Sequence, residues 1–367
     1  MAKRIYCSTP KEDGFYMPGE FEKQQCIWMI WPERPDNWRS GAVPAQKAYA
    51  DVAKAIVQFE PVIMLASKKQ FENCRKQLPL EIKVIEMESD DAWARDVGPS
   101  FLINKEGKLR ACDWTFNAWG GDLDGLYKPW DKDDKIARQI CEIAGADFYR
   151  TEGFVLEGGS FHVDGEGTVM VTEMCLLSKG RNPEMSKEEI EKKLCDYLNC
   201  EKVIWLKDGI DPEETNGHID DVACFTAPGE AACIYTEDET HSFYQAARAA
   251  YRTLCGAVDA KGRRLKVHKV CCTKKNVYFE DSFRIENNDC SIDRKGGDLC
   301  IASYLNFLIV NGGVIVPQYG DENDALALKQ IQEIFPERKA VGVMTREIVY
   351  GGGNIHCITQ QQPLEMK

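Results

Sequence analysis

One structural unit recurs along this chain at a nearly constant interval. The unit is a β-hairpin, in which two apolar or alternating runs flank a turn of Gly, Asn, Asp or Pro, and a helical segment follows it. The turn glycines Gly107, Gly167 and Gly229 are separated by 60 and 62 residues, and Gly312 follows after 83. Such a repeat predicts a fold built from copies of one supersecondary unit, with an insertion in the fourth copy.

Helices are predicted between the hairpins. Helical periodicity runs up to Pro61, Gly145 and Pro336, and proline and glycine are residues that end helices. Two further segments begin with the Ser-x-x-Gln or Ser-x-x-Glu pattern, which is typical of a capping box at the start of a helix. The expected helices cover residues 44–59, 132–144, 239–254 and 323–335, and two more open at Ser67 and Ser186.

A fifth copy of the unit is split between the two ends of the chain. Its C-terminal part is Gly352-Gly-Asn-Ile-His-Cys-Ile-Thr359, and its partner strand is Cys26-Ile-Trp-Met-Ile-Trp31. Pairing of these segments would close a ring and remove the exposed sheet edges. The sequence therefore predicts an α/β ring of about five strand-and-helix units. No linker rich in proline or serine divides the chain, so residues 1–367 are expected to form a single domain.

The composition narrows the choice of partner and compartment. The net charge of −13 disfavours nucleic acid and suits a cationic small molecule, although solubility alone also explains an acidic chain. The longest apolar run, residues 304–319, is interrupted by Asn306 and Asn311 and is too short to cross a membrane. The N-terminal residues lack an apolar signal core, so we expect a cytoplasmic protein whose sixteen cysteines are reduced and mostly buried.

Three titratable residues occupy the same position in successive units. Asp96, Glu157 and His218 lie immediately before three of the hairpins, and each interval between them is 61 residues. Cys357 lies in the fifth unit, after a run of three glycines. Because radial units bring the ends of their strands to a common axis, these four side chains are expected to share one pocket.

Each of these residues also has a structural alternative. A cysteine is commonly a small core residue, a buried histidine is commonly structural, Asp96 could cap a turn, and Glu157 could be a solvated loop charge. Their shared position in the repeat favours function instead. The two glycines after Glu157 predict a tight turn, and the Gly-His-Ile-Asp sequence places His218 and Asp220 on one side of an extended strand.

The residue types in this set suit a planar cation. A guanidinium presents N–H groups that carboxylates match bidentately, so Asp96 and Asp220 are expected to bind it. The Cys357 thiolate would attack the central carbon, and His218 would protonate the departing ammonia and then activate water. Glu157 would orient His218. Because the carboxylates oppose ionisation of the thiol, the thiolate is expected to form fully only when substrate is bound.

Four ordered motifs resemble those of the agmatine deiminases. They are Trp93-Ala-Arg-Asp96, Glu157-Gly-Gly-Ser160, Asn216-Gly-His-Ile-Asp220 and Gly352-Gly-Asn-Ile-His-Cys357-Ile-Thr-Gln-Gln, and the stretches Met17-Pro-Gly-Glu-Phe-Glu and Trp28-Met-Ile-Trp-Pro32 are also similar. The resemblance extends from about residue 13 to residue 363. It implies membership of the guanidine-modifying superfamily, whose fold is a five-bladed, pseudo-symmetric α/β propeller, the pentein fold.

The resemblance also implies a reaction, which is hydrolysis of agmatine to N-carbamoylputrescine and ammonia by a homo-oligomer without cofactor or metal. Its catalytic residues fall on the positions already singled out, namely Cys357, His218, Glu157, Asp96 and Asp220. It further implies Trp93 and Glu214 as substrate contacts. A core tryptophan and a solvated loop carboxylate are the structural alternatives for these two residues.

Other functions stay open at this point. Arginine or peptidyl-arginine deiminases share the chemistry, and amidinotransferases pass the amidino group to an amine instead of water. Free arginine has an α-carboxylate that needs a cation, whereas agmatine has an amine that suits an acid. Zinc could bind His218, Asp220 and Cys357, although no dense ligand motif is present. Ribosome-binding factors also use this propeller, but acidic charge disfavours an RNA surface.

Overall fold

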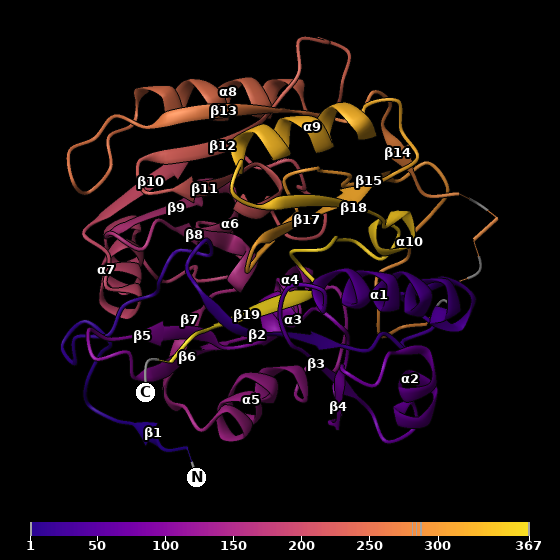
Figure 1. Ribbon diagram of the computed structural model, residues 1–367, viewed down its shortest axis with the longest axis horizontal. Coiled ribbons are helices and arrows are strands. Elements are labelled where there is room, and N and C mark those ends of the chain that lie inside the picture. Colours follow the sequence, from indigo (N-terminus) through magenta and orange to yellow (C-terminus); the bar gives the residue numbers. More distant parts are fainter. Residues whose placement is uncertain (1, 281, 284, 287, 366–367) are drawn as a thin grey trace.

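The protein is an α/β structure assembled from small sheets and connecting helices (Figure 1). The computed structural model describes residues 2–280, 282–283, 285–286 and 288–365. Five sheets share one plan, in which an antiparallel strand pair is extended by a third strand that runs parallel to its neighbour. The repeat in the sequence is therefore a repeat of this three-stranded unit.

Four of these sheets follow one another along the chain and contain the four predicted hairpins, which are confirmed. Their strands are β5 (Ser100–Ile103), β6 (Leu109–Thr115) and β7 (Asp147–Val155); β8 (Phe161–Val163), β9 (Thr168–Thr172) and β10 (Lys202–Leu206); β11 (Ala223–Ala227), β12 (Glu230–Tyr235) and β13 (Lys266–Cys271); and β16 (Leu308–Val310), β17 (Gly313–Gln318) and β18 (Lys339–Met344). A short N-terminal strand, β1 (Arg4–Ile5), extends the first of these sheets by pairing with β7.

The fifth sheet joins the two ends of the chain. β19 (Thr359–Pro363) pairs antiparallel with β2 (Gln24–Ile30), and β3 (Val62–Ala66) and β4 (Lys83–Glu86) continue the sheet. The yellow β19 accordingly lies beside the indigo β2 in Figure 1. The strand begins at Thr359, later than expected, because the glycine-rich stretch before it forms turns instead of a strand. Those turns carry Cys357.

Each parallel connection requires a crossover, and a helix supplies it. α8, for example, buries Ala247, Ala250 and Leu254, which recur at helical spacing on the face that contacts β12. Among the described residues, the crossover helices of the five repeated units are α1 (Val43–Ile56), α5 (Ile136–Ala144), α7 (Lys187–Leu198), α8 (Tyr244–Gly256) and α9 (Asp324–Ile334). The shorter helix α2 (Phe71–Gln77) connects the parallel strands β3 and β4. Other short helices are α3 (Ala94–Val97), α4 (Gly121–Asp124), α6 (Glu173–Leu176) and α10 (Arg346–Val349).

The two predicted capping boxes have different outcomes. At Ser186 the prediction is confirmed, because its hydroxyl accepts from the Glu189 amide and the Glu189 carboxylate accepts from the Ser186 amide. At Ser67 the prediction is wrong, since α2 begins only at Phe71. The Gln70 side chain bonds to Asn73 at 2.8 Å instead of reaching back to Ser67, which leaves residues 67–70 as a turn.

The long interval before the fourth hairpin is occupied by an excursion between β13 and β16. It contains a small antiparallel pair, β14 (Val277–Tyr278) and β15 (Leu299–Cys300). Between these strands the chain brings Ser291, Ile292 and Arg294 to the rim of the main pocket. The insertion therefore helps to form the candidate site described below. Within the described residues, no helix is long and apolar enough to cross a membrane.

Candidate active site

The residues singled out from the repeat lie on short turns that precede the first strand of each unit. Asp96 lies in α3, Glu157 precedes the 3-10 turn Gly158–Ser160, and His218 precedes a second 3-10 turn, Ile219–Asp221. These turns bring their side chains inward from three different sheets. Cys357 reaches the same region from the turns before β19.

Gly159 marks the point where three of these side chains meet. A Cβ atom added to Gly159 would lie 2.6 Å from Nδ1 of His218, 2.9 Å from Oδ2 of Asp220 and 3.1 Å from Oδ1 of Asp96. The Gly159 amide also donates to Asp96 Oδ1 at 2.8 Å. The convergence expected from the repeat is thus present in the structure, and any residue larger than glycine would displace part of it.

The expected strand geometry of His218 and Asp220 is wrong. His218 is extended, with φ −50° and ψ 146°, but Ile219–Asp221 form a 3-10 turn. The turn, rather than the alternation of a strand, brings both side chains to Gly159. The tight turn expected at the glycines after Glu157 is confirmed, because Gly158–Ser160 is also a 3-10 turn.

Cys357 is buried and held from two sides. Its Sγ lies 3.2 Å from Nδ2 of Asn306 and 3.7 Å from Oδ2 of Asp220. Asn306 Oδ1 also accepts from the backbone amides of His356, at 2.9 Å, and Cys357, at 3.3 Å. We did not predict a role for Asn306. Its sequence signal was its position as a polar residue that interrupts an apolar run just before the fourth hairpin.

The local charges oppose ionisation of the Cys357 thiol. Burial and the carboxylates of Asp220, Asp221 and Asp96 raise the pKa of the Cys357 thiol well above its ordinary value. A cation bound between the carboxylates would offset this effect, because it would place a positive charge beside the sulfur. The geometry thus supports the expectation of a thiol that ionises with substrate.

His218 lies between two carboxylates. Its Nε2 is 3.6 Å from Oε2 of Glu157, and its Nδ1 is 4.0 Å from Oδ2 of Asp96. Burial lowers the pKa of His218, but Asp96, Cys175 and Glu157 outweigh burial and hold the pKa well above its ordinary value. This direction favours the protonated form of His218, which is the form that can donate a proton.

Glu157 has a second partner that the sequence did not reveal. Nε of Arg181 lies 2.7 Å from Oε1 of Glu157, and both side chains are fully buried. Burial raises the pKa of Glu157, but Arg181 and His218 outweigh it and lower the pKa. Arg181 lies in the loop after α6, outside the repeated motifs, so the spacing gave no signal for it.

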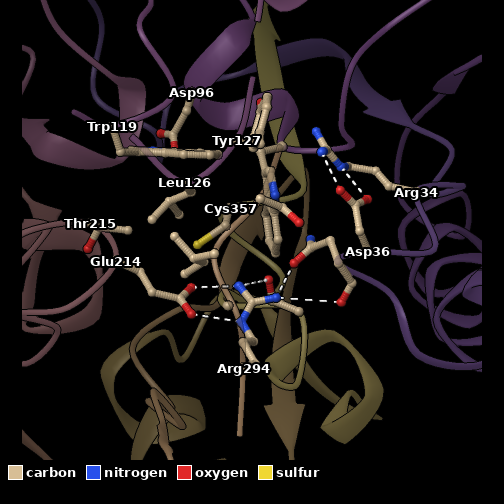
Figure 2. A pocket seen from close by; sticks show the side chains of 16 residues that line it. Arg34, Asp36, Asp96, Trp119, Leu126, Tyr127, Glu214, Thr215, Arg294 and Cys357 are labelled. Carbon is tan, nitrogen blue, oxygen red and sulfur yellow. Dashed lines mark hydrogen bonds and ion pairs between the residues drawn. The ribbon is translucent and has the colours of Figure 1, made fainter. Parts of the chain in front are cut away.

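A narrow pocket reaches Cys357 (Figure 2). Asp96 lies on one side of it, where the Trp119 indole donates to its Oδ2 at 2.9 Å. Trp93 also lines the pocket and stacks on Trp38 with ring centroids 5.1 Å apart. Trp93 is thus both a core residue and a pocket residue, so its two interpretations are compatible.

Glu214 lines the same pocket but is already paired. Nε and Nη2 of Arg294 each lie 2.8 Å from one of its carboxylate oxygens, as Figure 2 shows. Arg294 Nη2 also donates to the Gly351 carbonyl at 2.8 Å. Glu214 is therefore no freely solvated loop carboxylate. The inserted segment supplies Arg294, which is why the repeat could not reveal this pair.

Comparison with known proteins places the chain in a family. Residues 16–363 match the sequence profile of the Porphyromonas-type peptidyl-arginine deiminase family. The chain belongs to this family. A relative from Enterococcus faecalis, which carries the provisional name of an agmatine deiminase, is 68% identical over 363 residues, covering 99% of this chain and 100% of the relative.

Solved structures of family members show the same fold. An agmatine deiminase of Enterococcus faecalis, whose structure is described as catalysing its reaction, is similar with a TM-score of 0.99 and 66% identity over 100% of both chains. A C. jejuni agmatine deiminase with substrate bound is similar with a TM-score of 0.82 and 25% identity, covering 96% of this chain and 97% of that one.

The described residues contain two groups with the spacing of metal ligands. One is Glu20, His162 and His356, and the other is Glu157, Cys175 and His218. In each group a guanidinium already pairs with the glutamate, since Arg95 lies 3.3 Å from Glu20 and Arg181 lies 2.7 Å from Glu157. A resident positive charge at the glutamate opposes a divalent cation at the same place. The zinc set considered from the sequence, His218 with Asp220 and Cys357, is neither of these groups.

Proposed function

We propose that this protein hydrolyses agmatine to N-carbamoylputrescine and ammonia through a covalent amidino-cysteine intermediate. The observation that carries the proposal is the convergence of Asp96, Asp220 and His218 around Gly159, beside the thiol of Cys357. The similar proteins described above are agmatine deiminases by name, which supports agmatine as the substrate.

The substrate guanidinium would bind between Asp96 and Asp220. Asp220 Oδ1 is buried and has no hydrogen-bond partner among the described residues, so it is available to accept from the substrate. Each carboxylate accepts from a different edge of the planar cation. Bound in this way, the guanidinium would have its central carbon near the sulfur of Cys357, which lies 3.7 Å from Oδ2 of Asp220.

The first half of the reaction forms a carbon–sulfur bond and releases ammonia. The bound cation favours release of the Cys357 thiol proton to solvent, and the resulting thiolate attacks the guanidinium carbon to give a tetrahedral adduct. The imidazolium of His218 gives its proton to the departing nitrogen, and the C–N bond breaks. Glu157, itself anchored by Arg181, holds His218 in position.

The second half transfers the amidino group to water. Neutral His218 removes a proton from water, whose oxygen attacks the amidino carbon. Collapse of that adduct breaks the carbon–sulfur bond and returns the thiol with N-carbamoylputrescine as product. The overall change replaces an imino nitrogen by oxygen without net electron transfer, so the proposal requires no redox cofactor.

We assign the distal end of the pocket to the alkyl chain and ammonium of agmatine. Trp93 offers an aromatic face to the chain. Glu214 retains lone pairs for the ammonium, although Arg294 already uses one site on each oxygen. The α-carboxylate of arginine would need the Arg294 guanidinium, whose Nε and Nη2 Glu214 already occupies, which disfavours that substrate.

The arrangement of the five sheets, the oligomeric state and the cellular role also belong to the proposed function. We infer that the five sheets are the blades of a pentein propeller, closed by β19 and β2, because the turns of successive sheets contact one another beside the site. A homo-oligomer in the cytoplasm stays a prediction. So does a role in supplying putrescine, for which N-carbamoylputrescine is a chemical precursor.

The test is ammonia release from agmatine and from free arginine by the wild type, Cys357→Ser and a control, Cys7→Ser, at an exposed thiol. We expect activity on agmatine for the wild type and the control, and none for Cys357→Ser. Activity on arginine alone would refute the substrate assignment. Ammonia release by Cys357→Ser would refute the nucleophile, and amidino transfer to an added amine in place of hydrolysis would favour an amidinotransferase.

A further inference from the structure

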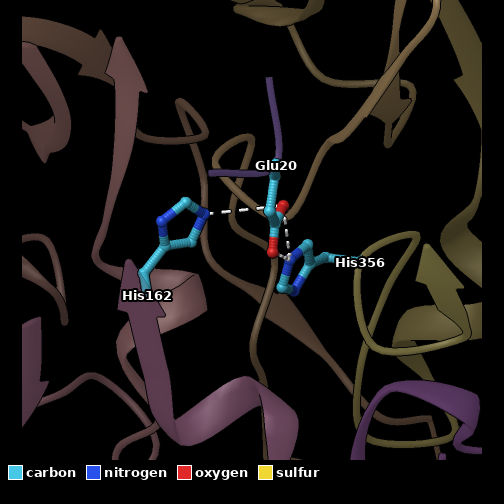
Figure 3. A group of neighbouring side chains, drawn as sticks. All are labelled: Glu20, His162 and His356. Atoms are coloured by element: carbon cyan, nitrogen blue, oxygen red, sulfur yellow. Dashed lines mark hydrogen bonds and ion pairs between the residues drawn. The ribbon is translucent and has the colours of Figure 1, made fainter. Parts of the chain in front are cut away.

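A second layer of charged side chains lies directly behind the guanidinium site. His356 precedes the nucleophile in the chain, and its Nδ1 lies 2.8 Å from Oδ2 of Asp220. Its Nε2 lies 2.9 and 3.1 Å from the two carboxylate oxygens of Glu20. All three side chains are buried. Figure 3 shows Glu20 between His356 and His162.

With Glu20 and Asp220 both ionised, this geometry requires a doubly protonated ring at His356. Ionised carboxylates only accept hydrogen bonds, so a ring that bonds to one at each nitrogen must donate at both. Burial and Arg95 lower the pKa of His356, but Glu20 and Asp220 outweigh them and raise it. The ring is therefore a buried cation between two anions.

The other neighbours of Glu20 complete this charge balance. Arg95 Nη1 lies 3.3 Å from Glu20 Oε1. His162 Nδ1 accepts from the Phe225 amide at 3.2 Å, so its Nε2 carries the proton and faces Glu20 Oε2 at 3.5 Å. Burial raises the pKa of Glu20, but His356, Arg95 and His162 hold it well below its ordinary value. Each carboxylate oxygen of Glu20 therefore lies beside a charged or hydrogen-bonding group.

The contact with His356 occupies one carboxylate oxygen of Asp220 and leaves the other able to accept a hydrogen bond. Asp220 Oδ2 accepts from His356 and lies 3.7 Å from Cys357 Sγ, while Oδ1 has no hydrogen-bond partner in the described part of the chain. Without the His356 contact, the carboxyl could rotate and would lose its charged partner. Both changes would weaken its contact with a cationic substrate.

We propose that His356 is a positioning residue, which clamps Oδ2 of Asp220 from behind and thereby leaves Oδ1 in place to accept from the substrate guanidinium. Glu20, braced by Arg95, holds the opposite edge of the ring. The inference rests on the proposed function, because it assigns Asp220 to a guanidinium.

The proposal predicts a specific pH dependence. Burial raises the pKa of Asp220, but the His356 contact outweighs it and lowers the pKa, so substrate binding by the wild type should not weaken at mildly acidic pH. In His356→Asn the contact is lost, and Asp220 should protonate at a higher pH. The other charged or titratable groups that face Asp220 or His356 are His218, Arg95, Asp96, Asp221, Glu20, His162 and Cys357.

The experiment measures kcat and KM for agmatine against pH, together with agmatine affinity by calorimetry in a Cys357→Ser background. His356→Asn is expected to raise KM and the dissociation constant by roughly 10- to 100-fold, with a new acidic limb in kcat/KM. His268→Asn is the matched control, because it removes the same side chain from a pair with a glutamate, Glu230, outside the cluster of Glu20, His356 and Asp220. It should leave the pH profile unchanged.

Equal profiles for His356→Asn and the wild type would overturn the inference while the wild-type activity upholds the proposed function. A wild type without activity on agmatine would overturn both. If His356→Asn does not fold, ¹⁵N spectra of the five wild-type histidines decide instead. Protons on both ring nitrogens of His356 at pH 8 are expected, and a neutral ring, or a divalent metal found bound there, would overturn the proposal.

Discussion

Replacing Gly159 by alanine tests whether activity depends on the close approach of His218, Asp220 and Asp96 at this glycine. The added methyl would lie 2.6, 2.9 and 3.1 Å from polar atoms of His218, Asp220 and Asp96. Ordinary contact distances begin at roughly 3.5 Å, so these groups must separate by roughly 0.5–1 Å. The φ of Gly159 is not in the left-handed region, so the effect comes from crowding rather than backbone strain.

The expected loss follows from the sensitivity of catalysis to position. A misplacement of about 1 Å can cost about 100-fold, so kcat/KM for Gly159→Ala should fall by about that factor. That fall corresponds to about 2.7 kcal/mol of transition-state stabilisation. The free energy of unfolding should fall by about 1–3 kcal/mol, as is typical of overpacking. Steady-state ammonia release and chemical denaturation measure the two quantities.

The matched control is Gly256→Ala, at the end of α8. No atom lies within 4 Å of a Cβ at Gly256, and its φ is also outside the left-handed region. This variant should keep full activity and gain about 0.4–1 kcal/mol of stability. If Gly159→Ala retained kcat/KM within about threefold of the wild type, the three side chains could not depend on their present separation, and the reasoning would be refuted.

Three further predictions concern single groups. Trp119→Phe removes the indole N–H that donates to Asp96. Loss of a hydrogen bond to a charged group costs about 1.5 kcal/mol, so KM for agmatine should rise about tenfold. An unchanged KM would count against Asp96 as a substrate ligand. The rate of alkylation of Cys357 in the free enzyme can be measured by peptide mass spectrometry, with the exposed Cys7 as the reference thiol. This rate should still increase with pH above ~8.5. A plateau near neutral pH would contradict a thiolate that forms only with substrate. Burial raises the pKa of Glu60 to about 7, so ionisation costs the folded state increasingly as pH rises through that value. Glu60→Gln should therefore increase the unfolding free energy by roughly 1–3 kcal/mol at pH 9 and little at pH 5, and a pH-independent effect would refute this assignment.

The sequence predicted the repeated parts of the molecule well because the repeat constrains them. The hairpins at Gly107, Gly167, Gly229 and Gly312 and the pairing of β2 with β19 follow from apolar patterning and turn residues, which act locally. The spacing also located Asp96, Glu157 and His218 correctly beside one another.

The partners of these residues could not be predicted in the same way. Arg181 lies in a loop, Arg294 in the insertion and Asn306 in an apolar run. None of these positions recurs with the repeat, so the spacing could not predict their contacts. Their pairing depends on tertiary packing between segments far apart in the chain. His356 lay within a recognised motif, but only the structure shows that its ring reaches Glu20, 336 residues away.

The central claim is a covalent intermediate on Cys357, and rapid acid quenching during turnover tests it most directly. Intact-protein and peptide mass spectrometry of wild type mixed with agmatine should show one adduct on the Cys357 peptide, with the mass of agmatine less one ammonia. The adduct should disappear when agmatine is exhausted and should be absent from Cys357→Ser. Turnover without any adduct on Cys357, or with the adduct on another of the sixteen cysteines, would contradict the account.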